Sequence, residues 1–336
     1  MTYKRILCGI DGSVSAERAT AVAVGLAIAS RAELIFAHAF DRPGTHPERL
    51  VGTAVEAAEA AGVRMVSGES RAGGAADALM ALADERDVGV IVVSGGRGKR
   101  YGLGQVAHRL AHHAPRDVLL VASEPSGVPD GQLYRHVVVA SDGSATADRA
   151  ARRGFGLAET LGATVTLVFV GHPKTGDLVT RDTIATFAGE IETAVELREG
   201  DPADEILKAA EDVKADLLVV GNKGMTGAKG FLLGSVPADV AEASTRDLLI
   251  VRTVMQTVTE LGPGEGGIID RAGEKIAAFV DAGGELHLMS ARCTHMGCTV
   301  AWNPGASTFD CPCHGSRYGP EGQVVNGPAA RPLPPA

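Results

Sequence analysis

The first three quarters of the 336-residue chain repeat themselves, and this repeat constrains the fold more than any other feature. Residues 5–13 (RILCGIDGS) are echoed by residues 136–144 (HVVVASDGS), and residues 116–121 (RDVLLV) return as residues 246–251 (RDLLIV). Between these ends, apolar runs of strand length alternate with Ala-rich helical stretches. Apolar runs that are each followed by a helix are typical of parallel strands covered on both faces. The repeat therefore predicts an α/β fold of two tandem doubly wound, Rossmann-like parallel-sheet units.

The apolar runs place five strands in each copy. In the first copy we expect strands near 5–10, 33–39, 62–67, 88–94 and 117–121, and in the second near 135–141, 163–170, 193–198, 215–221 and 247–251. A turn-rich linker, SEPSGVPDG, separates the copies. After residue 251, Gly-rich turns and short strand-like runs indicate a small all-β domain. We expect three domains, at residues 1–124, 134–252 and 254–336.

Composition and charge exclude several classes of protein. Hydrophobic residues make up 45% of the chain, which is ample for packed cores, and the formal net charge is −9. An acidic chain without a Lys/Arg run argues against nucleic acid as a partner. The sequence contains no run of eighteen apolar residues of the kind that spans a membrane. The first residues lead directly into a predicted strand, without the apolar core of a signal peptide. We therefore expect a cytoplasmic protein.

Two short segments near the C-terminus concentrate cysteine and histidine. They read CTHMGC at 293–298 and CPCHGS at 311–316. Two thiolates and two imidazoles are the ligands of a [2Fe–2S] centre in which one iron keeps cysteine and the other takes histidine. A zinc site of the C-x₂-C type has a different cysteine spacing, and disulfides alone would not explain two histidines at fixed offsets.

These segments resemble the C-x-H-x-G-C and C-P-x-H-G-S boxes of the Rieske family. The resemblance implies that Cys293 and Cys311 bind one iron, and that His295 and His314 bind the other. It also implies a Rieske [2Fe–2S] cluster as cofactor and a redox partner protein, which the sequence does not identify.

The resemblance further implies a disulfide between Cys298 and Cys313, which join the two loops in the family's high-potential members. A disulfide is unusual in the cytosol, and burial beside a cluster would protect it. The fifth cysteine, Cys8, lies in an apolar strand and is expected to be a packing residue.

Four further residues match positions around the family's cluster. By resemblance, the hydroxyls of Ser316 and Tyr318 hydrogen-bond a bridging sulfide and a ligand sulfur, and Gly327 and Pro328 form a loop that covers the cluster. Such donors stabilise the reduced cluster and raise its potential. We expect a midpoint toward the upper part of the roughly −150 to +300 mV Rieske range.

The fourth strand of the second copy runs into a glycine-rich segment, VVGNKGMTGAKGFLLGSV, with the spacing G-x₂-G-x₉-G-S. Glycines after a strand let backbone N–H groups approach phosphate, and the next helix N-terminus favours an anion. The spacing is neither that of a Walker A loop nor that of a dinucleotide fingerprint. It resembles the ATP-binding signature of universal stress proteins, whose domain pattern residues 1–252 follow.

By this resemblance, the site binds ATP or a related adenine nucleotide. The implied phosphate positions are Gly221, Gly224, Gly234 and Ser235, with Asp142 near the adenosine and Val170 facing the adenine. The alternative is that the glycines only shape a strand-to-helix turn.

The first copy departs from this pattern. Its equivalent segment is shorter, Ser94 and Arg97 replace the glycines, and Gln105 replaces the serine, although Asp11 is retained. We expect no nucleotide there. The run HRLAHH at 108–113 places two histidines one helical turn apart, as in a chelating pair, but no acid or cysteine accompanies it in the sequence. Its position before a proline at a helix end favours simple compensation of the helix dipole.

These features favour a redox-active stress-response protein, in which a one-electron cluster is tethered to a nucleotide-binding pair of domains. An oxygenase would need a second iron site of two histidines and a carboxylate, and none follows the boxes. No nucleophile with an oriented base is evident, so electron transfer or sensing is favoured over catalysis, with at most slow ATP hydrolysis.

Two alternatives stay open. One is a soluble Rieske electron carrier serving a reductase or oxidase, with the stress domains as a docking or dimerisation scaffold. The other is a structural stress protein whose cluster only reports oxidation or iron supply. Because universal stress folds pair through edge strands, the tandem copies suit either a monomer with internal pseudo-twofold symmetry or a homodimer.

Overall fold

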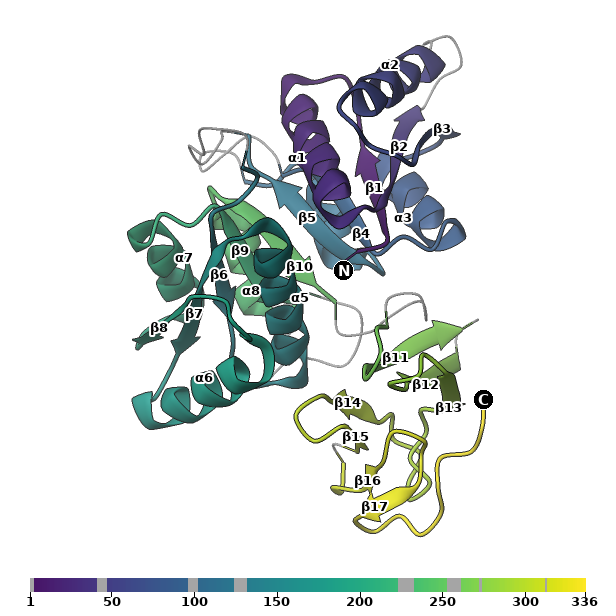
Figure 1. Cartoon of the computed structure of the whole chain (residues 1–336), viewed down its shortest axis with the longest axis vertical. Coiled ribbons are helices and arrows are strands. Elements are labelled where there is room, and N and C mark those ends of the chain that lie inside the picture. The colour runs from purple at the N-terminus through teal and green to yellow at the C-terminus, as the bar shows by residue number, and fades with distance from the viewer. Residues whose placement is uncertain are drawn as a thin grey trace. The chain divides into compact units, whose positions relative to one another are not determined.

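The computed structural model describes residues 3–40, 47–95, 102–123, 132–222, 233–252, 261–271, 274–311 and 313–336. The chain divides into two compact units, residues 1–252 and 253–336. The first unit contains both sequence repeats, and the second contains the small β domain (Figure 1).

Strands and helices alternate through both repeats. The first repeat comprises β1 (Arg5–Gly9), α1 (Val14–Ser30), β2 (Glu33–Phe40), α2 (Pro47–Ala60), β3 (Val66–Ala72), α3 (Ala75–Glu85), β4 (Val90–Ser94), α4 (Gln105–His113) and β5 (Asp117–Val121). The second comprises β6 (His136–Ala140), α5 (Ala145–Leu161), β7 (Thr164–Val170), α6 (Pro173–Phe187), β8 (Thr193–Arg198), α7 (Pro202–Asp212), β9 (Leu217–Gly221), α8 (Ser235–Ala243) and β10 (Asp247–Val251).

All ten of these strands form one sheet, in the order β3-β2-β1-β4-β5-β10-β9-β6-β7-β8. Neighbouring strands are parallel within each repeat, and β5 pairs antiparallel with β10, with Leu119 opposite Leu249. Helices α1, α2, α5 and α6 pack on one face of the sheet, and α3, α4, α7 and α8 pack on the other. The predicted α/β class is confirmed, and the two repeats share a single continuous sheet.

The repeated D-G-S motif forms the same turn in both copies. In the second copy, the Ser144 N–H donates to Asp142 Oδ1 at 3.0 Å, Gly143 has φ +77°, and Ser144 Oγ caps helix α5 by accepting from the Ala147 N–H. Residues 11–13 repeat this arrangement at the start of α1. A left-handed φ favours glycine, and serine is a preferred N-cap, so this part of the repeat is explained by local geometry.

Strand β3 lies later than the sequence predicted, at Val66–Ala72 rather than near 62–67. Val63 packs into the core from the turn after α2 and is not part of a strand. The real strand, VSGESRA, is an edge strand rich in polar residues, so an apolar run was the wrong signal. A Cβ on its Gly68 would lie 2.0 Å from Val51 Cγ1, because α2 packs directly over this position.

The seam between β5 and β10 contains a buried, pseudo-symmetric network of charges. Asp247, fully buried, accepts hydrogen bonds from Arg18 of the other repeat at 2.6 Å and from the Tyr134 hydroxyl at 2.9 Å. The equivalent Asp117 is held by Tyr3 at 2.9 Å, Arg153 at 3.2 Å and the Arg252 N–H at 2.8 Å. Each aspartate is therefore paired with an arginine from the opposite copy. These buried ion pairs hold the two copies together in addition to the pairing of β5 with β10.

The C-terminal unit contains two small antiparallel sheets, as the predicted all-β domain requires. One consists of β11 (Gly266–Arg271), β12 (Glu274–Val280) and β13 (Leu286–Ser290), and the other of β14 (Ala301–Asn303), β15 (Thr308–Asp310), β16 (Arg317–Tyr318) and β17 (Val324–Asn326). Leu333 of the C-terminal tail is buried in the core of this unit, and its N–H donates to the Gly322 carbonyl at 2.9 Å. Among the residues described in either unit, no helix has both the length and the apolar character needed to cross a bilayer.

Candidate metal centre and nucleotide site

The two Cys/His boxes form equivalent loops, one between β13 and β14 and the other between β15 and β16. In the first loop the Gly297 N–H donates to the Cys293 carbonyl at 2.8 Å, and in the second the Gly315 N–H donates to the Cys311 carbonyl at 3.1 Å. Both glycines have φ +74°, which explains why each box carries a glycine at this point. In each box the glycine follows the first cysteine by four residues, and this spacing produces the same turn in both loops.

The four candidate ligands separate into a buried pair and an exposed pair. Cys293 and Cys311 are 2% and 3% exposed, and their sulfur-bearing side chains belong to the core of the small domain. His295 and His314 are exposed, and their ring centroids lie 4.9 Å apart in an edge-to-face arrangement. The thiols thus point inward, while the imidazoles lie at the surface.

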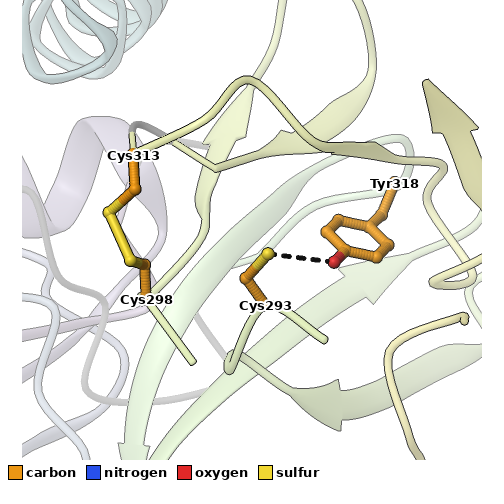
Figure 2. Close-up of a disulfide and its surroundings, with 4 residues drawn as sticks. All are labelled: Cys293, Cys298, Cys313 and Tyr318. Carbon is orange, nitrogen blue, oxygen red and sulfur yellow. Dashed lines mark hydrogen bonds between the residues drawn. A yellow bond between two sulfur atoms is a disulfide. The ribbon is translucent and has the colours of Figure 1, made fainter. Parts of the chain in front are cut away.

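A disulfide joins Cys298 of the first loop to Cys313 of the second, with their Cα atoms 6.7 Å apart (Figure 2). The Sγ atoms of Cys298, Cys311 and Cys313 all lie within 4.8 Å of one another, so the disulfide sits directly beside a candidate ligand. It cross-links the two loops at the place where both must keep their spacing.

Tyr318 reaches across to the buried sulfur of the first loop. Its hydroxyl lies 3.1 Å from Cys293 Sγ (Figure 2). The same hydroxyl accepts a hydrogen bond from the Thr294 N–H at 3.0 Å. Burial raises the pKa of Cys293, but hydrogen bonds from Tyr318, the His295 backbone, Cys311 and Ser316 together outweigh it and lower the pKa to about 7. The pocket therefore favours a thiolate, the form that binds metal.

The loop after β17 is fastened to the second box. The Ala329 N–H donates to Ser316 Oγ at 3.2 Å, and Ser316 is fully buried. Gly327 has φ +101°, and a Cβ there would lie 2.5 Å from Ser316 Cα. Only glycine allows this backbone approach, while Pro328 beside it is exposed.

This donor set fits a [2Fe–2S] group of the Rieske type. Two buried sulfurs, a lowered Cys293 pKa and two adjacent exposed imidazoles match a cluster with one cysteine-bound and one histidine-bound iron. Within the described residues, no other group of three metal-binding side chains is as compact as the three cysteines around the disulfide.

The candidate nucleotide residues lie along one edge of the sheet. Asp142 follows β6, Val170 ends β7 and Gly221 ends β9, and these strands are neighbours in the order β9-β6-β7. Gly234 and Ser235 begin α8, whose N-terminus has no side-chain cap. The carboxyl ends of parallel strands are where open α/β sheets bind ligands. Gly224 lies outside the described residues.

Gly221 is required by packing. A Cβ there would lie 2.6 Å from Thr146 Cγ2 and 3.2 Å from the Thr146 carbonyl oxygen, at the start of α5. The first repeat has Ser94 at the end of β4 and Gln105 at the start of α4, in keeping with a degenerate copy. Its Arg97 lies outside the described residues.

Asp148, in the first turn of α5, was not singled out from the sequence. Burial raises its pKa to about 6, and the neighbouring charge of Asp142 acts in the same direction. An acid in the first turn of a helix is so common that sequence alone gave no reason to select it.

The histidine run of α4 has an acidic neighbour that the sequence did not indicate. His108 Nε2 lies 3.8 Å from Glu242 Oε1 of helix α8, in the other repeat. The rings of His108 and His112 stack with centroids 4.4 Å apart. Burial lowers the pKa of His112, and the positive groups His108, His113 and Arg252 lower it further.

Comparisons with known proteins agree with the division of the chain into residues 1–252 and 253–336. The universal stress protein family matches residues 2–122, 133–186 and 174–252, and the Rieske [2Fe-2S] domain matches residues 252–336. A crystal structure of a universal stress protein from Archaeoglobus fulgidus is 20% identical, with a TM-score of 0.60, and the match covers 75% of this chain and 99% of that one. This likeness supports the fold of the first unit.

Similar curated proteins match the C-terminal unit. The putative Rieske 2Fe-2S iron-sulfur protein YhfW of Bacillus subtilis is 51% identical over 74 residues, which are 22% of this chain and 14% of that protein. The cytochrome b6-f complex iron-sulfur subunit of Chlorobaculum tepidum is 34% identical over 119 residues, 31% of this chain and 66% of that protein. The chain thus spans less than two thirds of either relative. It belongs to the universal stress protein family, with two tandem domains followed by a C-terminal Rieske [2Fe-2S] domain.

Proposed function

We propose that this protein couples one-electron transfer at the Rieske domain to adenine-nucleotide binding by the second universal stress domain. The observation that carries the redox half is the separation of the candidate ligands, with buried Cys293 and Cys311 behind exposed His295 and His314. A bound [2Fe–2S] group supplies reversible one-electron chemistry.

The residues around the group would have distinct roles. Cys293 and Cys311 would hold the inner iron, and His295 and His314 the outer one, so that the imidazole edge faces a redox partner. Tyr318 and Ser316 would donate hydrogen bonds toward sulfur, which favours the reduced form. The Cys298–Cys313 disulfide would maintain the spacing of the two loops.

The nucleotide half rests on the sheet edge of the second repeat. The uncapped N-terminus of α8 offers backbone N–H groups to phosphate, and Gly221 ends β9 at the same edge of the sheet. Asp142 would contact the nucleoside, and Val170 would offer its backbone to the base. We also propose a cytoplasmic location, because adenine nucleotides are intracellular metabolites, and a monomer in which the two copies pair internally.

A specific observation favours the electron-carrier alternative. Met296, between the first box's histidine and its glycine, is 68% exposed next to the exposed His295, so a redox partner that docks on the imidazole face would also bury this side chain. In that case the stress domains would serve only as a scaffold.

A spectroscopic redox titration of the purified full chain, with and without saturating ATP, tests the proposal. We expect a rhombic Rieske signal in the reduced protein and a midpoint that ATP moves by about 59 mV, which for one electron is tenfold coupling or about 1.4 kcal/mol. Asp142→Ala should weaken the ATP response, while Asp11→Ala, which removes the same turn contact in the first copy, should not.

The possible outcomes are distinct. Absence of the Rieske signal would overturn the redox half, and absence of ATP binding would overturn the nucleotide half. A midpoint that stays constant although ATP binds would reject coupling and support the electron carrier.

A further inference from the structure

Three potential metal ligands, which belong neither to the cluster boxes nor to the nucleotide residues, lie at the seam between the repeats. His108 and His112 belong to α4 of the first repeat, and Glu242 belongs to α8 of the second. His108 Nε2 lies 3.8 Å from Glu242 Oε1, and the two imidazole centroids lie 4.4 Å apart.

The chemistry of this set is that of a transition-metal site. Two histidines spaced i, i+4 project from one helix face, as in the H-x-x-x-H pair that binds zinc in metalloproteases. A carboxylate from a second helix completes a His₂Glu set, which leaves a fourth position for water. Imidazole and carboxylate together suit Zn²⁺ and neighbouring divalent transition metals.

The backbones that carry these ligands are firmly placed. Leu110 and Ala111 of α4 and Val240 and Ala241 of α8 are buried in the same core. Glu242 is anchored as well, because its Oε2 accepts a hydrogen bond from the Leu103 N–H at 3.2 Å. The two helices are therefore held at a constant spacing by packing.

The side chains, by contrast, have room to adjust. His108 and Glu242 are 54% and 45% exposed. Rotation of the His108 ring, while Leu103 keeps Glu242 Oε2 in place, can replace the stacked ring pair by three donors that converge on one ion. Zinc bonds to these ligand types measure about 2.0–2.2 Å, which places two ligand atoms of a tetrahedral site roughly 3.3–3.6 Å from each other. The 3.8 Å between His108 Nε2 and Glu242 Oε1 is slightly wider, so a modest closing movement is required.

Two arginines nearby donate hydrogen bonds to groups other than these ligands, although burial and the charge of Arg252 both lower the pKa of His112. Arg109 Nη2 lies 2.6 Å from Asp77 Oδ1 on the far side of α4. Arg252 donates to the carbonyls of Leu110 and Ala111 at 2.8 and 2.7 Å. The Glu242 carboxylate instead faces His108, the imidazole with which it would share an ion.

We propose that His108, His112 and Glu242 bind a divalent transition-metal ion of the Zn²⁺ class across the seam of the tandem stress domains. The ion links α4 to α8 and so fastens the first repeat to the second. This site is independent of the proposed redox and nucleotide functions.

The test uses the full-length, cluster-loaded protein and Zn²⁺ in competition with a chromophoric chelator. Wild-type protein should bind one more Zn²⁺ per chain than Glu242→Gln, or bind it at least about tenfold more tightly, since even indirect supports of a metal ligand contribute that much. His112→Ala should have the same effect. Zn²⁺ should also raise the melting temperature of the stress-domain unit in wild type but not in Glu242→Gln or His112→Ala.

His113→Ala is the matched control, because His113 is exposed on the same helix and its ring lies 6.1 Å from that of His112. It should bind Zn²⁺ as wild type does. Glutamine at 242 keeps an acceptor for the Leu103 N–H, and circular dichroism should show an unchanged fold. Equal Zn²⁺ affinity in wild type and Glu242→Gln, or an equal loss in His113→Ala, would overturn the proposal and indicate adventitious chelation by the histidine run.

Discussion

At the scale of single residues, Gly327 and Gly284 share a left-handed backbone but differ in their surroundings. Their φ angles are +101° and +87°. A Cβ on Gly327 would lie 2.5 Å from Ser316 Cα, whereas nothing lies within 4 Å of one on Gly284. Substituting each glycine by alanine therefore distinguishes two effects: backbone strain alone at Gly284, and backbone strain together with a steric clash at Gly327.

Gly284→Ala should cost about 1 kcal/mol, since alanine is strained at positive φ. Gly327→Ala should cost roughly 1–3 kcal/mol more, since it also overpacks the loop against the second box. Thermal melting of the C-terminal unit and the visible absorbance of the cluster measure both effects. Equal losses in the two variants would show that the close approach at Gly327 is unimportant.

Tyr318 offers a second prediction at this scale. Tyr318→Phe removes the hydroxyl that lies 3.1 Å from Cys293 Sγ, and so removes a donor that stabilises the reduced cluster. The midpoint should fall by about 30–60 mV, or roughly 1 kcal/mol for one electron. Thr299→Val, which replaces an exposed residue just beyond the first box, is the control and should leave the midpoint in place.

The raised pKa of Asp148 should make the free energy of unfolding depend on pH. Its folded pKa of about 6 lies above the ordinary value of 3.8, so the folded state binds the proton more tightly than the unfolded chain. The free energy of unfolding should therefore decrease as the pH rises from about 4 to about 6. Asp148→Asn should flatten this slope in urea titrations and stabilise the protein at pH 7. A steeper fall in the variant would contradict the assignment.

At the scale of elements, the junction of β5 and β10 decides how the two repeats combine. Each repeat has one buried aspartate at the start of its last strand, and each aspartate accepts from an arginine of the opposite repeat. The outer strands β3 and β8 carry the charged pairs Arg71–Glu69 and Arg198–Glu196 instead. Charges on an edge strand discourage another strand from adding to that edge. The two repeats therefore pair through their apolar last strands, β5 and β10, and not through β3 or β8.

Asp247→Ala tests the junction. It removes the fully buried carboxylate that accepts from both Arg18 and the Tyr134 hydroxyl, which should destabilise the first unit by about 3–5 kcal/mol. The double variant Arg18→Met, Asp247→Leu should recover much of this loss because no buried charge remains unpaired. Urea denaturation measures both. If the single variant were as stable as wild type, the ion pair would not be what holds the seam.

At the scale of the whole molecule, the chain divides into two units rather than one per sequence domain. The tandem stress domains share a sheet and a buried charge network, whereas the C-terminal unit has its own cores and its own cross-link. Cooperative unfolding follows such shared cores.

We therefore expect two calorimetric transitions for the cluster-loaded protein, not three. Removing the cluster should lower the melting temperature of the C-terminal unit only, since a bound group stabilises only the unit that binds it. Separate melting of the two stress domains would refute the shared-sheet interpretation, as would a shift of both transitions on cluster loss.

The sequence by itself determined the features that are written in local patterns. Alternating apolar and helical runs predicted the α/β class, and the spacing of the two boxes identified the candidate ligands, because each pattern is complete within a short stretch of chain. Strand β3 was misplaced because an edge strand lacks the apolar run that marks a buried one.

Only the tertiary structure decided which distant segments meet. Arg18 pairs with Asp247 across 229 residues, and His108 approaches Glu242 from the other repeat. Neither contact has a sequence signal, because each partner is ordinary within its own helix or strand. Periodicity and turn chemistry act over a few residues, whereas these contacts follow from the antiparallel pairing of β5 with β10, which packing of the whole sheet selects.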